Sequence, residues 1–242
     1  MGKQPHLLID EDDIHDIAIL PGDPDRVQRI ADRCSSHEHV SHNREYQVTN
    51  AEVDGRPLTI CSTGIGSPSA AIAMEELCRL GVDTFLRVGT CGALQSEIEI
   101  GEFIIATAAA KDEGTTKRYE RSTLPAVADL TVVSELVDAA KTRGEDTHIG
   151  PIVTDDAFYA ETDAYVQAWE TANLLAVEME AASIFTIARR YGRRSGAICT
   201  VDGNLVRGTQ KGETTGDQEL PEASDEAIDS AIDIALTAVT SL

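Results

Sequence analysis

The chain has 242 residues, of which 42% are hydrophobic, and its 42 acidic side chains outnumber 20 basic ones to give a formal net charge of −22. Such a negative field repels nucleic acids and anionic lipid surfaces, so we expect neither as a partner. No window approaches the roughly 18 apolar residues of a membrane span, and the length suits one α/β domain over residues 1–242.

The first elements expected along the chain are a buried strand, a helix and a hairpin. The apolar run 17–20 predicts the strand, and residues 23–34 have helical spacing. Strands over 44–53 and 56–63 follow, joined by Asp54-Gly55, a dipeptide typical of tight hairpin turns.

A second helix is expected over 64–81, with Ser67 as its N-cap, Pro68 at its first position and Gly81 at its end. Residues 84–89 then predict another buried strand. Further strands are expected over 102–110, 148–154 and 195–201, and further helices over about 129–143, 177–192 and 222–242.

The alternation of strands and helices predicts an α/β fold with a mixed, mostly parallel, twisted sheet flanked by helices. Ligands of such folds bind beyond the carboxyl ends of the strands. We therefore expect the site in the stretches that follow strands, at 21–26, 62–69, 87–95 and 200–204. The polar, Gly/Thr-rich segment 208–216 is expected to be a mobile loop that acts as a lid.

Two of these stretches combine glycine with arginine. Gly22 precedes Arg26 at an expected helix start, and Arg87 stands just before Gly89, Thr90 and Gly92. Glycine allows close backbone approach, helix N-termini favour anions, and guanidinium groups match phosphate oxygens. The pattern favours a small free oxyanion such as phosphate. The chain has no P-loop and no GxGxxG motif, so neither ATP nor NAD is indicated.

The five cysteines are scattered and form neither a CxxC pair nor a Cys/His cluster with zinc spacing. This usage predicts reduced, mostly buried thiols rather than a disulfide framework. The first residues also lack a secretory signal pattern. Together these features predict a cytoplasmic protein.

Several long motifs in the same order make the chain resemble the trimeric/hexameric nucleoside phosphorylase superfamily, and most of all its uridine phosphorylase branch. The resemblance implies an α/β fold around a distorted, barrel-like mixed sheet, assembled as a homodimer or as a hexamer of three dimers. The matching segments are 21–27, 41–45, 61–69, 75–95, 124–129 and 177–183.

The resemblance implies that phosphate is held by Gly22, Arg26, Arg87 and Thr90 of one subunit. It also implies that Arg44 reaches this phosphate from the neighbouring subunit, which makes a dimer the minimum functional unit. The alternative for Arg26 and Arg87 is an ordinary surface salt bridge, which an acidic protein would readily form.

Ribose recognition is implied for the segment 178–180. Glu180 is expected to accept hydrogen bonds from the 2′- and 3′-hydroxyls, Met179 to pack on the sugar and Glu178 to support them, with Thr90 also close to the sugar. His6 is expected to cross to the 5′-hydroxyl in the neighbouring subunit. Without the resemblance, two glutamates that open a helix are more often partners of the helix dipole.

The base is expected to contact Cys91, Gly92, Phe158 and Asp202. Uridine phosphorylases hold uracil with a Gln-x-Arg pair after the aromatic residue, but the stretch 158–167 has neither residue at the right offset. Asp202 resembles the aspartate that protonates or hydrogen-bonds purine N7 in purine nucleoside phosphorylases, although the commoner form has it one residue later, at Gly203. Its alternative role is that of a simple Asp-Gly turn.

These features favour a nucleoside phosphorylase that cleaves a 6-oxopurine ribonucleoside such as guanosine or inosine, with Asp202, Arg87 and Glu180 as the catalytic residues. The first alternative is a uridine phosphorylase. The second is a nucleosidase of the same superfamily, and the third is a non-catalytic nucleoside-binding protein.

Phosphorolysis needs no metal and no covalent intermediate, so no cofactor is expected beside the co-substrate phosphate. A structural potassium ion at the dimer interface is a further expectation from the resemblance. The matching positions are Glu45, Ile65 and Ser69.

The basic residues comprise only five lysines beside fifteen arginines. A carboxylate-rich, lysine-poor surface is typical of a protein that works in molar salt, where self-repulsion is screened. The alternative is an ordinary acidic protein with a local acidic interaction face. We favour adaptation to high salt.

The net charge of −22 should make the stability of the protein depend on salt. Added KCl should raise the melting temperature from a low value in dilute buffer, because screening removes repulsion between the carboxylates. Thermal unfolding followed over a KCl series measures the effect. A melting temperature that does not rise with KCl would contradict adaptation to high salt.

Overall fold

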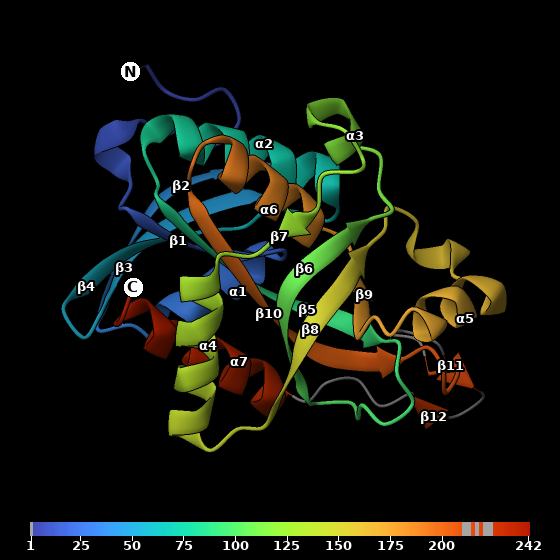
Figure 1. Ribbon diagram of the computed structural model, residues 1–242. Helices are drawn as coiled ribbons and strands as arrows, with labels where there is room; N and C mark the ends of the chain where they lie inside the picture. The colour runs from blue at the N-terminus through green and yellow to red at the C-terminus, as the bar shows by residue number, and fades with distance from the viewer. Residues whose placement is uncertain (1, 210–213, 216–217, 220–224) are drawn as a thin grey trace.

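A computed structural model of the chain describes residues 2–209, 214–215, 218–219 and 225–242 (Figure 1). Most of the segment 208–216, expected to be a mobile lid, lies outside these residues. No helix in the described part is long and apolar enough to cross a membrane.

Five strands close into a ring. Within it, β5 (Thr84–Ala93) pairs in parallel with β10 (Arg194–Asn204) and antiparallel with β9 (Ala176–Glu178). β6 (Phe103–Lys111) and β8 (Thr147–Thr154) complete the ring, since β10 pairs with β6, β6 with β8 and β8 with β9. The expected mixed, barrel-like α/β fold is confirmed.

The sheet continues from β5 away from this ring. β1 (Ile17–Pro21) lies in parallel between β5 and β4 (Arg56–Cys61), and β3 (Tyr46–Val53) and β2 (Ser36–Asn43) follow antiparallel. The β3–β4 turn has positive φ angles at Asp54 (48°) and Gly55 (80°), as the hairpin dipeptide predicts. β2 was not expected, because its polar sequence on an exposed edge carries no apolar alternation.

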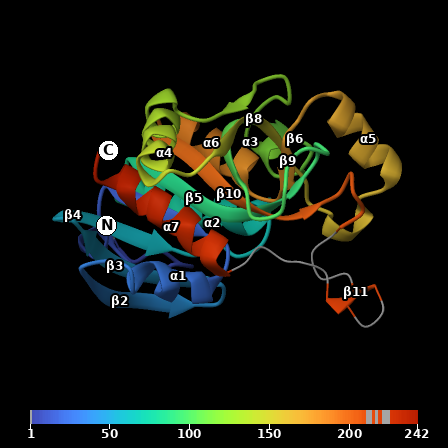
Figure 2. The same ribbon diagram turned by 90° about the horizontal axis from the view of Figure 1, so that it is seen from below.

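Two groups of helices cover the sheet (Figures 1 and 2). α2 (Ser67–Leu80) and α6 (Ala181–Arg190) pack on each other and share one apolar cluster with the ring strands. α1 (Pro24–Ala31), α4 (Leu130–Arg143) and α7 (Asp225–Val239) belong to a second apolar cluster on the other side. The two larger parts of the core therefore lie on opposite sides of the sheet, and a small third cluster contains Leu94, Val153, Leu174 and Val177.

The remaining elements are short. β7 (Ala126–Val127) pairs antiparallel with β6, and β11 (Thr214–Thr215) pairs antiparallel with β12 (Gln218–Glu219). The other helical elements are α3 (Thr116–Tyr119), α5 (Asp163–Thr171) and 3₁₀ turns at Glu11–Asp13 and Phe158–Ala160.

Helix starts differ from the expectation in two places. α2 begins at Ser67, with Gly66 as its N-cap at φ 91°, because the Ser67 hydroxyl donates to the Met179 carbonyl (3.1 Å) instead of capping. Gly81 ends α2 in the left-handed region at φ 110°, as expected. The helix expected from residue 177 begins only at Ala181, because residues 176–178 form β9.

Two stretches expected as loops are strand. β5 runs on to Ala93 and β10 to Asn204, since the two strands pair from the Thr84–Arg194 register to the Ala93–Asn204 register. Residues 87–93 and 200–204 therefore lie on paired backbone, except for Asp202. This pairing fixes their positions more firmly than a loop would.

Candidate active site

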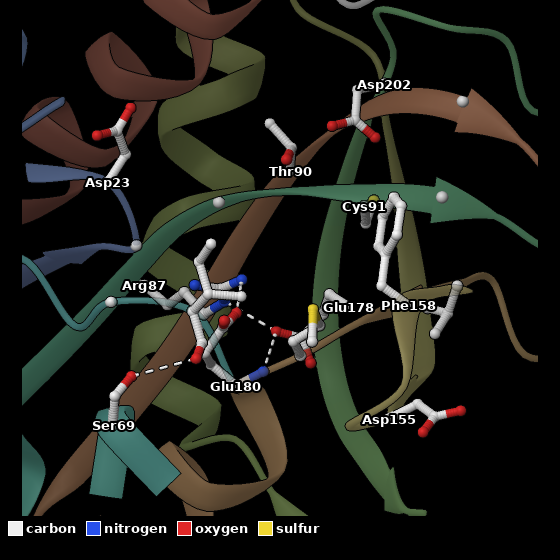
Figure 3. Close-up of a pocket in the computed structure, with 18 of the residues that line it drawn as sticks. Asp23, Ser69, Arg87, Thr90, Cys91, Asp155, Phe158, Glu178, Glu180 and Asp202 are labelled. Atoms are coloured by element: carbon white, nitrogen blue, oxygen red, sulfur yellow. Dashed lines mark hydrogen bonds and ion pairs between the residues drawn. The ribbon is translucent and has the colours of Figure 1, made fainter. Parts of the chain in front are cut away.

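One cavity of about 780 Å³ lies at the carboxyl ends of β1 and β5. Its walls come from the β1–α1 and β4–α2 connections, from β5, β9 and β10, and from the segment after β8. Figure 3 shows Arg87 with Glu178 and Glu180 at one end of it, and Asp202 and Phe158 at the other. The cavity therefore brings together residues that are far apart in the chain.

Arg87 on β5 is buried and lies between two carboxylates. Its Nε is 2.9 Å from Glu178 Oε2, and its Nη2 pairs with Glu180 Oε2. Burial alone lowers the pKa of Arg87, but the charges of Glu180 and Glu178 more than offset this and raise it. The Nη1 group is buried and makes no hydrogen bond within the described part of the chain. It is thus a donor that an anion in the cavity can satisfy.

Glu178 is occupied by the start of α6. Oε1 accepts from the Thr154 hydroxyl (2.6 Å), Oε2 accepts from the Glu180 N–H (2.9 Å), and both oxygens accept from the Ala181 N–H (3.0 Å). A carboxylate at a helix N-terminus satisfies backbone donors that have no partner within the helix. Glu178 therefore orients the next residues and anchors Arg87.

Glu180 is the N-cap of α6, and its side chain faces the β4–α2 connection. Oε1 accepts from the Gly66 N–H (2.6 Å), while Oε2 meets Arg87. Burial and the charge of Glu178 raise the pKa of Glu180, although Arg87 and the Gly66 N–H lower it. Met179 borders the same cavity and accepts from Ser67 through its carbonyl. Met179 and Glu180, the two residues expected to bind the sugar, are thus held by contacts to the start of α2.

A second arginine borders the same end of the cavity. Arg26 on α1 has a lowered pKa, first because it is partly buried and second because Arg87 carries a like charge nearby. An anion between the two guanidinium groups would relieve this repulsion. Gly89 leaves room for the Arg87 guanidinium, since a Cβ at Gly89 would lie 2.8 Å from Arg87 Cζ. Gly22 and Thr90 also border the cavity.

At the other end of the cavity, Asp202 lies on a β-bulge. β10 pairs Val201 with Cys91 and Gly203 with Gly92, which leaves Asp202 as the extra residue. Bulges turn a side chain away from the regular alternation, and Asp202 borders the cavity close to Thr90 (Figure 3). The Asp-Gly pair is therefore part of a strand and not a simple turn.

Phe158 borders the same end of the cavity as this bulge. It begins the 3₁₀ turn 158–160, and its ring meets that of Tyr159 edge-on, with centroids 5.1 Å apart. Phe158 and Cys91 both border the cavity. Leu205 covers Gly92 so closely that a Cβ there would lie 2.2 Å from Leu205 Cδ1. These groups form apolar walls suited to a planar ring.

Sequence reasoning missed several residues that border the cavity. Asp155 follows β8 directly, so the rule that ligands bind at carboxyl ends of strands could have identified it. The others carry no sequence signal of their own. They are Tyr159, Glu161, Val177 and Leu205.

Two expected site residues lie away from this cavity. Arg44 is exposed in the β2–β3 turn at φ 57°. His6 Nδ1 lies 2.6 Å from Glu76 Oε1, and the backbone N–H groups of His6 and Leu7 donate to the same carboxylate. Neither residue borders the cavity of its own chain.

The three residues matched to a potassium site, Glu45, Ile65 and Ser69, all border the cavity. The Ser69 hydroxyl donates to the Thr63 carbonyl (2.6 Å). Among the described residues, no group of three or more His, Cys, Asp or Glu side chains is placed to hold a metal ion. A potassium ion here stays a prediction.

The thiols are poor candidates for a nucleophile. All five cysteines are free. Contact with the Cys199 thiol and burial raise the pKa of Cys91 well above its usual value, and burial raises the pKa of Cys61 to about 12. Since the thiolate is the reactive form, Cys91 at the cavity is a neutral wall residue at physiological pH.

Comparisons with known proteins agree on one family. The profile of the phosphorylase superfamily matches residues 16–240. A guanosine phosphorylase of Halorubrum lacusprofundi is 62% identical over 242 residues, which is 100% of both chains. A uridine phosphorylase of Thermococcus kodakarensis is 39% identical over 93% of this chain and 85% of its own. The structure of a purine nucleoside phosphorylase from Toxoplasma gondii in complex with immucillin-H matches with a TM-score of 0.90 at 28% identity, covering 100% of this chain and 96% of that one.

Arg87→Ala should destabilise the fold by about 3–5 kcal/mol, because it leaves two buried carboxylates without their cation. The pKa of Glu180, already raised by burial, should rise further. A group whose pKa is higher in the folded state stabilises at low pH and loses that contribution as pH rises through the folded pKa. The penalty should therefore be larger at pH 8 than at pH 5.

Urea unfolding at fixed KCl measures this free energy. Arg121→Ala, which removes an exposed guanidinium, is the control and should change stability little. Equal stability of Arg87→Ala and Arg121→Ala at pH 8 would contradict the structural role of Arg87.

Proposed function

The chain belongs to the phosphorylase superfamily, and we propose that it is a nucleoside phosphorylase acting on a 6-oxopurine ribonucleoside such as guanosine. The reaction converts nucleoside and inorganic phosphate into free base and ribose 1-phosphate. The observation that carries the proposal is the order of groups along one cavity. Arg26 and Arg87 lie at one end, Glu180 faces the same space, and Asp202 and Phe158 lie at the other end.

The phosphate end supplies charge and position. Arg87 Nη1 and the Arg26 guanidinium can bind phosphate oxygens, and the paired β5 backbone holds Arg87 in place before the substrate arrives. Phosphate bound on one face of the sugar places negative charge near C1′, where positive charge develops. Its oxygen then forms a bond to C1′ with inversion as the bond to the base breaks.

Glu180 and Met179 border the part of the cavity that we assign to the ribose. A buried carboxylate accepts hydrogen bonds from the 2′- and 3′-hydroxyls, and the thioether packs on the apolar face of the ribose. These contacts fix C1′ between the phosphate and the base. Glu178 acts behind them, since its oxygens are used by α6 and Arg87.

The leaving base takes the electron pair of the broken C1′–N9 bond. A hydrogen bond or proton at purine N7 neutralises that charge, and Asp202 is the group at the base end that we assign to it. Three observations support a purine over uracil. The Gln-x-Arg pair is missing from residues 158–167, Asp202 borders the cavity, and the relative at 62% identity is a guanosine phosphorylase.

Retention of Arg26, Arg44 and Arg87 supports phosphorolysis over hydrolysis by a nucleosidase, which does not need the full set. It also argues against a non-catalytic binding protein, which would be expected to lose these arginines or Glu180. Uridine phosphorylase stays the second candidate, because the relatives at 36–39% identity are uridine phosphorylases.

The minimum functional unit that we propose is a dimer, with a hexamer as the full assembly. Arg44 and His6 lie away from the cavity of their own chain, which suits residues that complete a neighbour's site. The cytoplasmic location is supported by five free thiols. Adaptation to molar salt is supported by the net charge of −22 and by the relative from a halophile, Halorubrum lacusprofundi.

A substrate panel tests the proposed function. Guanosine and inosine should release free base in molar KCl only when phosphate is added, and uridine, thymidine, cytidine and adenosine should react much more slowly. Base release and ribose 1-phosphate formation are measured together. Base release without phosphate would indicate a nucleosidase, and faster cleavage of uridine than of guanosine and inosine would make this a uridine phosphorylase.

Asp202→Asn should lower kcat for guanosine by about 100-fold, the scale of a lost general acid, while the KM for phosphate changes only a few-fold. The matched control is a substrate, 7-methylguanosine, whose N7 already carries positive charge and needs no proton. Its cleavage should be affected far less by the variant. Equal loss with both substrates would remove Asp202 from protonation of the base.

A further inference from the structure

The middle of α2 carries a buried carboxylate among apolar side chains. Glu76 is 3% exposed, and its helix neighbours Ala73 and Leu77 belong to the apolar cluster that α2 shares with α6. In the described part of the chain, every hydrogen bond to the Glu76 carboxylate comes from His6 or Leu7. Burying a carboxylate is costly unless its oxygens are hydrogen-bonded. Glu76 is therefore stabilised in α2 by the N-terminal segment.

The N-terminal segment itself has other anchors. Leu7 and Ile9 are fully buried in the same apolar cluster. The Ser41 hydroxyl donates to the Leu7 carbonyl (2.8 Å), and the Gln4 N–H donates to the Ile9 carbonyl (2.8 Å). Beyond these contacts, the backbone N–H groups of His6 and Leu7 need only an acceptor, which the oxygen of a neutral amide would supply. A carboxylate at position 76 matters chiefly for the third group that it contacts, the His6 ring.

The His6 ring is held in one orientation. Its Nδ1 lies 2.6 Å from Glu76 Oε1, and its edge packs on the Tyr46 ring with centroids 6.5 Å apart and planes at 79°. Both Glu76 oxygens already accept backbone N–H groups, so we place the hydrogen of the ring contact on Nδ1. Nε2 has no hydrogen-bond partner among the described residues, and the side chain is 38% exposed. The ring thus offers Nε2 as an acceptor in a fixed direction.

The same hydrogen-bonded unit includes the turn that carries Arg44. Asn43 Nδ2 donates to the His6 carbonyl (2.7 Å), and Asn43 pairs with Tyr46 where β2 and β3 meet. Arg44 lies in the turn between them. His6 and Arg44, the two residues assigned above to a neighbouring subunit's site, are therefore held together. The guanidinium suits an anion, and the free Nε2 suits a hydroxyl group.

We propose that Glu76 is a positioning residue, which orients His6 so that Nε2 accepts a hydrogen bond from the 5′-hydroxyl of a nucleoside in the neighbouring subunit. This inference rests on the proposed phosphorolysis and the proposed dimer, and it adds a preference for substrates with a free 5′-hydroxyl. A 5′-deoxynucleoside has no donor for Nε2 and gains nothing from the fixed ring. Glu76 does not border the cavity and acts through His6.

The test compares kcat/KM for guanosine with kcat/KM for 5′-deoxyguanosine, a ratio that does not depend on the amount of folded enzyme. Wild type should prefer guanosine. Glu76→Gln should lower the ratio by roughly 3- to 10-fold, the scale of one hydrogen bond, mainly through the KM for guanosine. Cleavage of 5′-deoxyguanosine should stay unchanged.

A double-mutant cycle shows whether Glu76 acts through His6. His6→Ala should lower the ratio at least as much as Glu76→Gln, and the double variant should match His6→Ala, because the ring that Glu76 orients is then absent. Glu75→Gln is the matched control and should keep the wild-type ratio, since the Glu75 carboxylate contacts Arg79 (3.1 Å) and Tyr191 (2.6 Å) instead.

Glu76→Asp is the second variant if Glu76→Gln does not fold. It keeps the charge but withdraws the carboxylate from the His6 ring by one methylene group, so it should also lower the ratio. A wild-type ratio near one, or an unchanged ratio in His6→Ala or in the Glu76 variant, would overturn the role of Glu76 while leaving phosphorolysis intact.

Two further outcomes would also overturn it. A ratio in the double variant well below that of His6→Ala would show that Glu76 does not act through His6, and an equal fall in Glu75→Gln would show a general effect on α2. Absence of phosphate-dependent cleavage of guanosine by wild type would instead overturn the proposed function, and with it this inference.

Discussion

The buried ion pairs of Arg87 with Glu178 and Glu180 connect the parts of the molecule that form the cavity. Arg87 comes from β5, Glu178 from β9 and Glu180 from the N-cap of α6. Glu178 also binds Thr154 at the end of β8, and Glu180 binds the Gly66 N–H ahead of α2. One cation and two carboxylates leave an excess of one negative charge, which the backbone N–H groups of Gly66, Glu180 and Ala181 offset. The remaining acceptor capacity of Glu180 suits the role that we propose for it, binding the hydroxyl groups of a sugar.

The pairing of β5 with β10 sets the distance between the two chemical ends of the cavity. Both strands continue well past their apolar runs, so Arg87 and Asp202 stand on the same two-stranded ladder. Two glycines of β5 leave space for neighbouring side chains, Gly89 for the Arg87 guanidinium and Gly92 for Leu205. The bulge at Asp202 then breaks the regular alternation and presents a carboxylate at the end of the cavity that we assign to the base. The site is therefore carried on rigid elements rather than on loops.

The scarce cations of this acidic chain are used in two different ways. On the surface, Arg29 of α1 and Arg33, which follows α1, pair with Asp225, Asp229 and Asp233 of α7, a network that is weakened by salt screening. Inside the cavity, Arg26 and Arg87 are shielded from salt and face the space assigned to phosphate. A chain with this net charge would otherwise repel an anionic substrate, and in the role that we propose for them these two arginines create the local field that attracts it.

The sequence by itself determined the alternation of strands and helices, the hairpin turn at Asp54-Gly55, and the motifs that carry Arg26, Arg87 and Glu180, because these depend on local patterns and short motifs. It also indicated that the base end differs from a uridine site, through the missing Gln-x-Arg pair. The tertiary structure alone decided that residues 90–93 and 202–204 are strand, that the Glu178 carboxylate accepts from N–H groups at the start of α6 while Glu180 reaches the β4–α2 connection, and that Glu161 borders the cavity. The physical reason is that strand ends and side-chain partners are set by hydrogen bonds between distant segments. A polar stretch such as β2, or a lone glutamate after a 3₁₀ turn, carries no trace of those partners in its own residues.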